Sequence, residues 1–106
     1  MQLPNRYRAY LDPAKLTYLL THPSKAGLFR AAGFNEDNVD TLEQGLLLIG
    51  QTQPVVEVEV TPYGTKYVIE GHIQVPDKEL WPMRTVWIIE PDEEAPRFVT
   101  ARPPKP

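Results

Sequence analysis

The spacing of apolar residues changes at Val55, and this change constrains the fold more than any other feature of the sequence. Before it, Val39, Leu42, Leu46 and Ile49 recur at the three- and four-residue spacing of one helix face. After it, the valines at positions 56, 58 and 60 alternate with glutamates, as in a half-buried strand whose two faces differ. Helices followed by antiparallel strands predict an α+β fold, in which N-terminal helices pack on one face of a sheet.

The first half of the chain predicts three helices, over residues 12–20, 24–32 and 36–49. Asp12 and Pro13 suit the N-cap and the first position of the first helix. Gly33 suits the left-handed position that ends a helix, and Phe34 after it is placed to contact Phe29, as in a Schellman motif. The glycine that follows residue 49 is expected to end the third helix.

The second half predicts a meander of about four strands, the later ones over residues 66–75, 83–89 and 97–102. In the second strand Tyr67, Ile69 and Ile73 share one face, which should pack on the helices. The other face of that strand is charged and polar, so it should stay open. The 106 residues are expected to form a single domain, 1–106, with a proline-rich extended tail over residues 103–106.

Composition excludes several classes of protein. The chain has no cysteine, which excludes disulfides and thiolate chemistry, and its two histidines lack metal-ligand spacing, so we expect no metal and no cofactor. No stretch approaches the roughly 20 apolar residues of a membrane-spanning helix, so a soluble, cytoplasmic protein is expected. The formal net charge is -3, yet acidic and basic residues gather in different segments, which permits a positive cleft on a negative protein.

An arginine stands at the start of an otherwise apolar strand, and it is the best pointer to a site. An unpaired buried charge is costly, so Arg84 should have either a function or a partner. The structural alternative is an ion pair across the sheet with Glu57, Glu59 or Glu70. Trp87 in the same strand is expected in the core rather than on a base-stacking surface.

Basic, hydroxyl and aromatic side chains accompany this arginine on the second helix and the sheet. Cleavage of RNA needs a base for the 2′-hydroxyl, cations for the pentacovalent phosphate and an acid for the leaving oxygen. Such side chains supply all three without a cofactor. The competing interpretation is an ordinary solvated face of an antiparallel sheet. Besides Arg84, the set contains His22, Lys25, Tyr63, Lys66, His72, Arg97, Thr100 and Arg102.

Four segments together resemble a known domain family. They are Ser24-Lys25-Ala26 with Gly33-Phe34, Tyr63-Gly64-Thr65-Lys66-Tyr67, Arg84-Thr85-Val86-Trp87, and Pro96-Arg97-Phe98-Val99-Thr100-Ala101. The chain resembles, over residues 3–103, an uncharacterised bacterial family of short stand-alone proteins and C-terminal tips of polymorphic toxins. The layout of that family is similar to the barnase, EndoU, colicin D and RelE ribonucleases. This similarity implies N-terminal helices on a four-stranded antiparallel sheet that carries a metal-free site.

The resemblance also implies roles for individual residues. Lys25 or Lys66 would act as base or phosphate clamp, Arg84 would stabilise the transition state, and Thr100 would orient the substrate. The substrate-binding residues would then be His22, Tyr63, His72, Arg97 and Arg102. Family members tend to have tyrosine where this chain has an arginine at position 102.

The function that the resemblance implies is a metal-independent ribonuclease-like toxin of a toxin–antitoxin module. Its partners would be RNA and a small cognate antitoxin or immunity protein that covers the open sheet face. The alternative is a non-enzymatic module of the same fold, which uses that open face to bind a protein. Convergence of the predicted catalytic residues in one cleft favours the enzyme, and dispersal over two faces favours the binding module.

Overall fold

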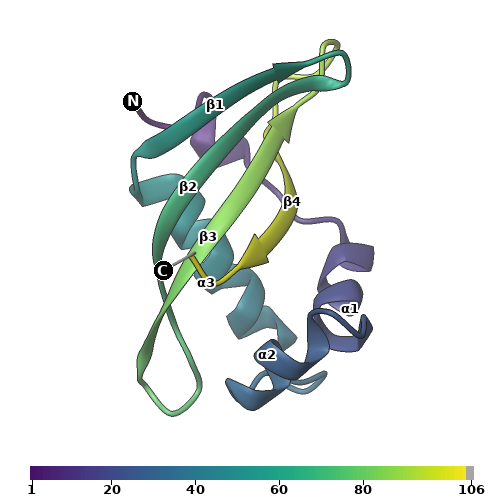
Figure 1. Ribbon diagram of the computed structural model, residues 1–106, viewed down its shortest axis with the longest axis vertical. Coiled ribbons are helices and arrows are strands. Elements are labelled where there is room, and N and C mark those ends of the chain that lie inside the picture. The colour runs from purple at the N-terminus through teal and green to yellow at the C-terminus, as the bar shows by residue number, and fades with distance from the viewer. Residues whose placement is uncertain (105–106) are drawn as a thin grey trace.

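The computed structural model describes residues 1–104 of the chain. A short 3-10 helix comes first, followed by three α-helices and then four strands in a single antiparallel sheet. This confirms the predicted α+β meander (Figure 1). The elements are η1 (Arg6–Arg8), α1 (Pro13–Thr21), α2 (Ala26–Ala31), α3 (Val39–Thr52), β1 (Val55–Thr61), β2 (Gly64–Gln74), β3 (Leu80–Ile89) and β4 (Arg97–Arg102).

The sheet follows the chain in the order β1-β2-β3-β4, and the helices cover one of its faces. Helix α3 packs on β2 and β3, while α1 packs on β4 and on α2 (Figure 1). The core between the two layers contains Ile69 and Ile73 from β2, as predicted from their spacing. It also contains the fully buried Trp87, which confirms the expected core position of that residue. The helices contribute Phe29, Phe34, Leu42, Leu46 and Ile49.

Helix α3 differs from its predicted bounds at both ends. It begins three residues late, because Asn38 and Asn35 bond to nearby backbone groups and hold the preceding segment in a turn. Glycine at position 50 does not end it, and the helix continues to Thr52. A Cβ on Gly50 would lie 2.7 Å from Cζ2 of Trp87, so close helix–sheet packing explains this glycine.

Helix α2 ends in the predicted Schellman motif. The amide of Phe34 donates to the carbonyl of Phe29 at 3.0 Å, and the amide of Gly33 donates to the carbonyl of Arg30 at 3.0 Å. Gly33 has a φ of 103°, in the left-handed region that favours glycine. Both phenylalanines are buried and belong to the same core cluster.

Replacing Gly33 with alanine is expected to lower the free energy of unfolding by about 1 kcal/mol, because alanine is strained at this positive φ. Gly27→Ala is the matched control. This glycine lies within α2, no other part of the protein comes within 4 Å of the place where the alanine methyl group would stand, and the substitution gains up to about 1 kcal/mol of helix propensity. Chemical denaturation of both variants measures the two effects. Equal changes in the two variants would contradict the capping role.

Strand β1 departs from the expectation of a half-buried strand. Its valines at 56, 58 and 60 are all exposed, by 53%, 46% and 81%. Among the described helices and strands, β1 packs only against β2. The two-residue alternation correctly identified a strand, but the helical layer does not reach far enough to cover it.

The proline-rich tail begins immediately after β4. Pro103 is exposed and Pro104 is partly buried, and neither belongs to a helix or strand. Residues 105 and 106 of the predicted tail lie outside the described residues.

Candidate functional site at the end of strand β4

Lys25 is positioned by the break between the first two helices. Pro23 follows His22 and α1 ends there, because the residue before a proline avoids helical angles. The carbonyl of His22 then accepts hydrogen bonds from the amides of Lys25 and Ala26, at 2.9 and 2.8 Å. This turn makes Lys25 the residue that precedes α2, at the side of the helical layer that packs on β4.

The ammonium group of Lys25 is held against the outer edge of the sheet. Its Nζ donates to the carbonyl oxygen of Ala101 at 3.2 Å, across 76 positions of sequence. Strand β4 is the last strand of the sheet, so this carbonyl has no strand beyond it as a partner. Partial burial, and secondarily the positive charge of Arg102, lower the pKa of Lys25 from its ordinary value.

Thr100 and Arg102 flank this carbonyl on the strand. Their partners across the sheet are Val86 and Arg84, so their side chains lie on the face away from the helices. Arg102 is exposed, and within residues 1–104 neither Arg102 nor Lys25 forms an ion pair. We refer to Lys25, Thr100 and Arg102 as the β4-end site.

Arg84 lies directly opposite Arg102 and is held by two carboxylates. One guanidinium nitrogen is 3.1 Å from Glu70, and another is 3.3 Å from Glu57. Like charges opposite each other on a sheet are unfavourable, and the two glutamates offset that repulsion at Arg84. The ion pair that the sequence offered as the structural alternative is therefore present.

Replacing Arg84 with alanine is expected to lower the free energy of unfolding by about 1–2 kcal/mol, because two carboxylates lose their shared cation. A double-mutant cycle with Glu70→Ala measures the coupling by urea denaturation. The coupling should fall as salt is added, because the carboxylates are partly exposed. Additive effects of the two substitutions would show that the pair contributes nothing to stability.

Three other predicted site residues lie away from the β4 end. Lys66 lies opposite Ile88, whereas Arg84 lies opposite Glu70. Four residues of β2 therefore separate Lys66 from the level of Arg84, which is roughly 13 Å at the usual strand rise. Tyr63 lies at the tip of the β1–β2 hairpin and is 80% exposed. His72 lies opposite Pro82, two residues beyond the level of Arg84, on a strand that β3 separates from β4.

The remaining two, Arg97 and His22, lie near α1. Arg97 donates twice to one carboxylate oxygen of Glu90, at 3.1 and 2.8 Å. The ring of His22 lies 4.5 Å from that of Tyr18, and its Nδ1 is 2.8 Å from the hydroxyl of Ser24. Both side chains thus have local partners, although His22 remains exposed.

A cavity of about 240 Å³ lies between α1 and β4, and the sequence interpretation did not include its lysine. The Lys15 ammonium lies 5.4 Å from the ring centre of Tyr18, at i and i+3 on one side of α1. The three-residue spacing of Lys15 and Tyr18 was the sequence signal that could have identified this cavity. The lining residues are Asp12, Ala14, Lys15, Tyr18 and Arg97.

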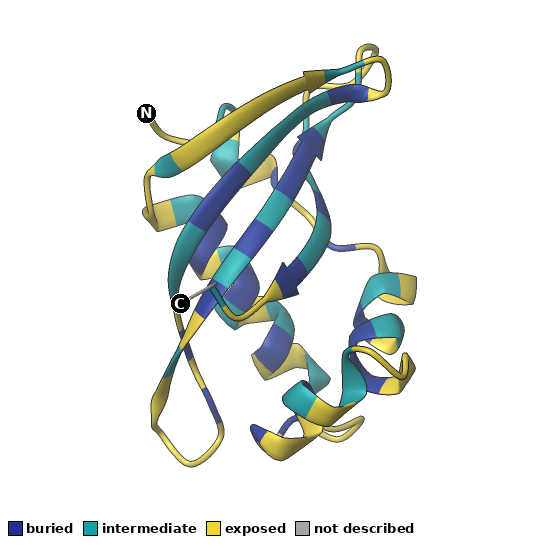
Figure 2. Ribbon diagram, viewed as in Figure 1, coloured by how far each residue is buried: buried dark blue, intermediate teal, exposed yellow. Residues whose placement is uncertain are grey.

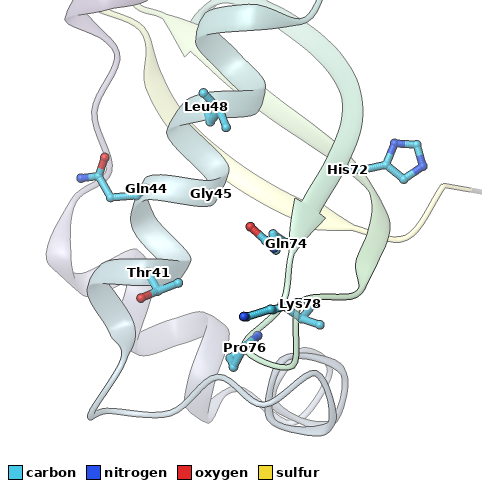
Figure 3. Close-up of a pocket in the computed structure, with 9 residues that line it drawn as sticks. Thr41, Gln44, Gly45, Leu48, His72, Gln74, Pro76 and Lys78 are labelled. Carbon is cyan, nitrogen blue, oxygen red and sulfur yellow. The ribbon is translucent and has the colours of Figure 1, made fainter.

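A larger cavity, of about 400 Å³, lies between α3 and the end of β2 (Figure 3). It is lined by none of the four predicted catalytic residues. Although His72 borders it, its ring points away from the space between the helix and the strand (Figure 3). The cavity is lined by Thr41, Gln44, Gly45, Leu48, His72, Gln74, Val75, Pro76 and Lys78.

Neither a metal centre nor a membrane-spanning helix is present in the described part of the chain. Within residues 1–104, His, Asp and Glu side chains nowhere form a group of three placed to hold a metal ion. Over the same residues, no helix has the length and apolar character needed to cross a bilayer.

Comparison with known proteins gives a structural relative and a family. One chain of the solved contact-dependent growth inhibition toxin–immunity protein complex from Klebsiella pneumoniae 342 matches with a TM-score of 0.74 and 16% identity. The match covers 95% of this chain and 97% of that one, so the two share a fold. No curated protein matches this sequence. The sequence model of a domain of unknown function, DUF6883, matches residues 2–105, and the protein therefore belongs to the DUF6883 family.

Proposed function

We propose that this protein is a small toxin that cleaves RNA without a metal ion, at the β4-end site. The observation that carries the proposal is the pairing of Lys25, whose ammonium is partly buried, with an exposed Arg102 that lacks a carboxylate partner within the described chain. Two neighbouring basic side chains that form no ion pair within residues 1–104 suit a phosphodiester. The fold shared with a chain of a toxin–immunity complex supports a toxin role.

The proposed reaction uses the nucleophile that RNA itself carries. The 2′-hydroxyl oxygen attacks the adjacent phosphorus as its proton passes to Lys25, and the bond from phosphorus to the 5′-oxygen breaks as that oxygen takes a proton from solvent. The products are a 2′,3′-cyclic phosphate and a 5′-hydroxyl. In this scheme Lys25 would accept the first proton as a neutral amine, a form that its lowered pKa favours relative to an ordinary lysine, and the ammonium so formed would face the phosphate beside Arg102.

The other groups act on charge and orientation in this scheme. Negative charge builds up on the phosphate oxygens in the transition state, and Arg102 would stabilise it. The hydroxyl of Thr100 would orient the phosphate from the same strand face. Arg84, which the resemblance assigned to the transition state, would instead position Arg102 through its own ion pairs with Glu57 and Glu70.

The second candidate is a protein-binding module of the same fold. The observation that favours it is the dispersal of Lys66, Tyr63 and His72, which lie apart from the β4 end. In either case a small cognate partner would cover the open sheet face. For the enzyme, such a partner would block the β4-end site and so protect the cell that makes the toxin, whose RNA lies in the cytoplasm.

Induced expression in bacteria tests the toxin proposal. We expect growth to stop and cellular RNA to be fragmented with the wild-type chain, and both effects to disappear with Arg102→Gln at equal protein levels. A stable, folded wild-type protein that leaves growth and RNA unchanged would contradict the nuclease and favour the binding module. Arrested growth with intact RNA would support a toxin of another activity.

A further inference from the structure

The outer edge of β1 is an unprotected strand edge. It is the first strand in the order of the sheet, so its far side has no strand neighbour in the described chain. The only described backbone bond beyond the sheet is at its first residue, where the amide of Val55 donates to the carbonyl of Met1 at 2.7 Å. Exposed edges are usually blunted by lysine, proline or β-bulges; β1 contains neither lysine nor proline, and its irregularity between Val55 and Glu57 leaves residues 57–61 regularly paired with β2.

Apolar side chains accompany this free edge. The register places Val58 and Val60 opposite Tyr67 and Thr65, on the sheet face that the helices cover elsewhere. The helices do not extend over β1, and Figure 2 shows this strand as a mostly exposed ribbon along the margin of the sheet. A strand that added to β1 would bury these valines and pair the free backbone groups at the same time.

The charge around this edge is acidic. Glu57 and Glu59 alternate with the valines; Glu57 is shared with Arg84, and Glu59, which lies opposite Lys66 in the register, forms no ion pair within residues 1–104. The tip of the β1–β2 hairpin lies against Glu90, because a Cβ on Gly64 would be 2.9 Å from its Cα. The acidic segment 91–94 continues from there. The carboxylate of Glu59 is therefore available to a cation on a strand that adds to this edge.

A second copy of the chain fits this edge poorly. In a two-fold antiparallel pair of β1 strands, residues opposite each other lie on the same face of the sheet. Pairing centred on Val58 would set Glu57 of one copy opposite Glu59 of the other, and like charges directly opposite each other are destabilising. The arrangement favours a different protein.

We propose that the free edge of β1 is a docking site for a strand of a separate protein in which lysine or arginine alternates with apolar residues. The apolar side chains would cover Val58 and Val60, and the cations would face Glu57 and Glu59. Main-chain hydrogen bonds would provide the pairing, and the charges would select the partner. This inference does not depend on the nuclease proposal, because the edge is open whether or not the β4-end site cleaves RNA; β1 is connected to that site only through the ion pair of Glu57 with Arg84.

Two synthetic hexapeptides test the proposal with the purified full chain: one alternates lysine and valine, and the other alternates glutamate and valine. We expect the lysine peptide to shift and protect the backbone amides of residues 56–60 in NMR spectra and hydrogen exchange. It should bind at least roughly fivefold more tightly than the glutamate peptide, the ratio expected from one good cross-strand charge pair.

Glu59→Lys should reverse this preference, whereas Glu79→Lys, at an exposed site in the distant β2–β3 turn, should preserve it. Equal binding of both peptides, or protection confined to β4, would overturn the proposal. A wild-type chain that dimerises through β1, with exchange protection that depends on protein concentration, would assign the edge to a second copy instead.

Discussion

Replacing Trp87 with alanine is expected to lower the free energy of unfolding by about 3–5 kcal/mol, the range for removing a large aromatic side chain from a core. The side chain is fully buried between the sheet and α3. Its ring meets that of Phe98 edge-on, with centres 5.4 Å apart, and it lies against Gly50 of the helix. Alanine would remove the residue that joins the two layers and would leave a cavity that the rigid strand and helix cannot close.

A polar contact adds to this loss. The indole Nε1 donates to the buried hydroxyl of Thr85 at 2.9 Å, and that hydroxyl donates to the carbonyl of Ile69 at 2.8 Å. Urea denaturation followed by circular dichroism measures the change. Trp81→Ala is the matched control. Trp81 is only partly buried and lies at the beginning of β3, so its replacement should lower the free energy of unfolding much less. Equal losses for the two tryptophans would contradict the central position of Trp87.

The second large effect concerns activity. Arg102→Gln and Lys25→Ala are each expected to lower the rate of RNA cleavage by roughly 10²–10³, the range for a preorganised group that stabilises charge in the transition state. Stability should change little in Arg102→Gln, because the side chain is exposed and unpaired within the described residues. Single-turnover cleavage and thermal unfolding of each variant separate lost chemistry from lost fold.

Lys66→Ala and Tyr63→Ala are the controls for this prediction. Both residues were predicted site residues, and both lie away from the β4 end. We expect changes in rate of less than about threefold in these variants. A loss in Lys66→Ala as large as in Lys25→Ala would move the site along the open face toward the β1–β2 hairpin.

Residue spacing was sufficient to predict the helices and strands, and the buried faces of α3 and β2. The Schellman end of α2 was predictable because its signals, Gly33 and the two phenylalanines, are local. The exposure of β1 was not predictable, because alternating apolar residues show which side chains share a face of the strand but not how far the helical layer extends over it. The expectation that Gly50 ends a helix was wrong for a related reason, because its role depends on Trp87, which is distant in sequence.

The candidate site was only partly predictable. A charge within an apolar strand required partners, and two of the three glutamates considered, Glu57 and Glu70, hold Arg84. The contact of Lys25 was not foreseeable, because its acceptor is a backbone carbonyl, and every residue has one. Arg102 was predicted only as a substrate-binding residue, at a position where family members tend to have tyrosine. Its proposed role in the transition state comes from its place opposite Arg84 and beside Lys25.

The central claim is that the protein cleaves RNA through the 2′-hydroxyl at the β4-end site. The most direct measurement incubates purified protein with a defined RNA and a metal chelator, and identifies the chemical ends of the products. We predict a 2′,3′-cyclic phosphate with the wild-type chain, and no product when the nucleotide at the cleaved position is 2′-deoxy or when Lys25 and Arg102 are both replaced. Intact RNA with the folded wild-type protein, or equal cleavage by that double variant, would contradict the claim.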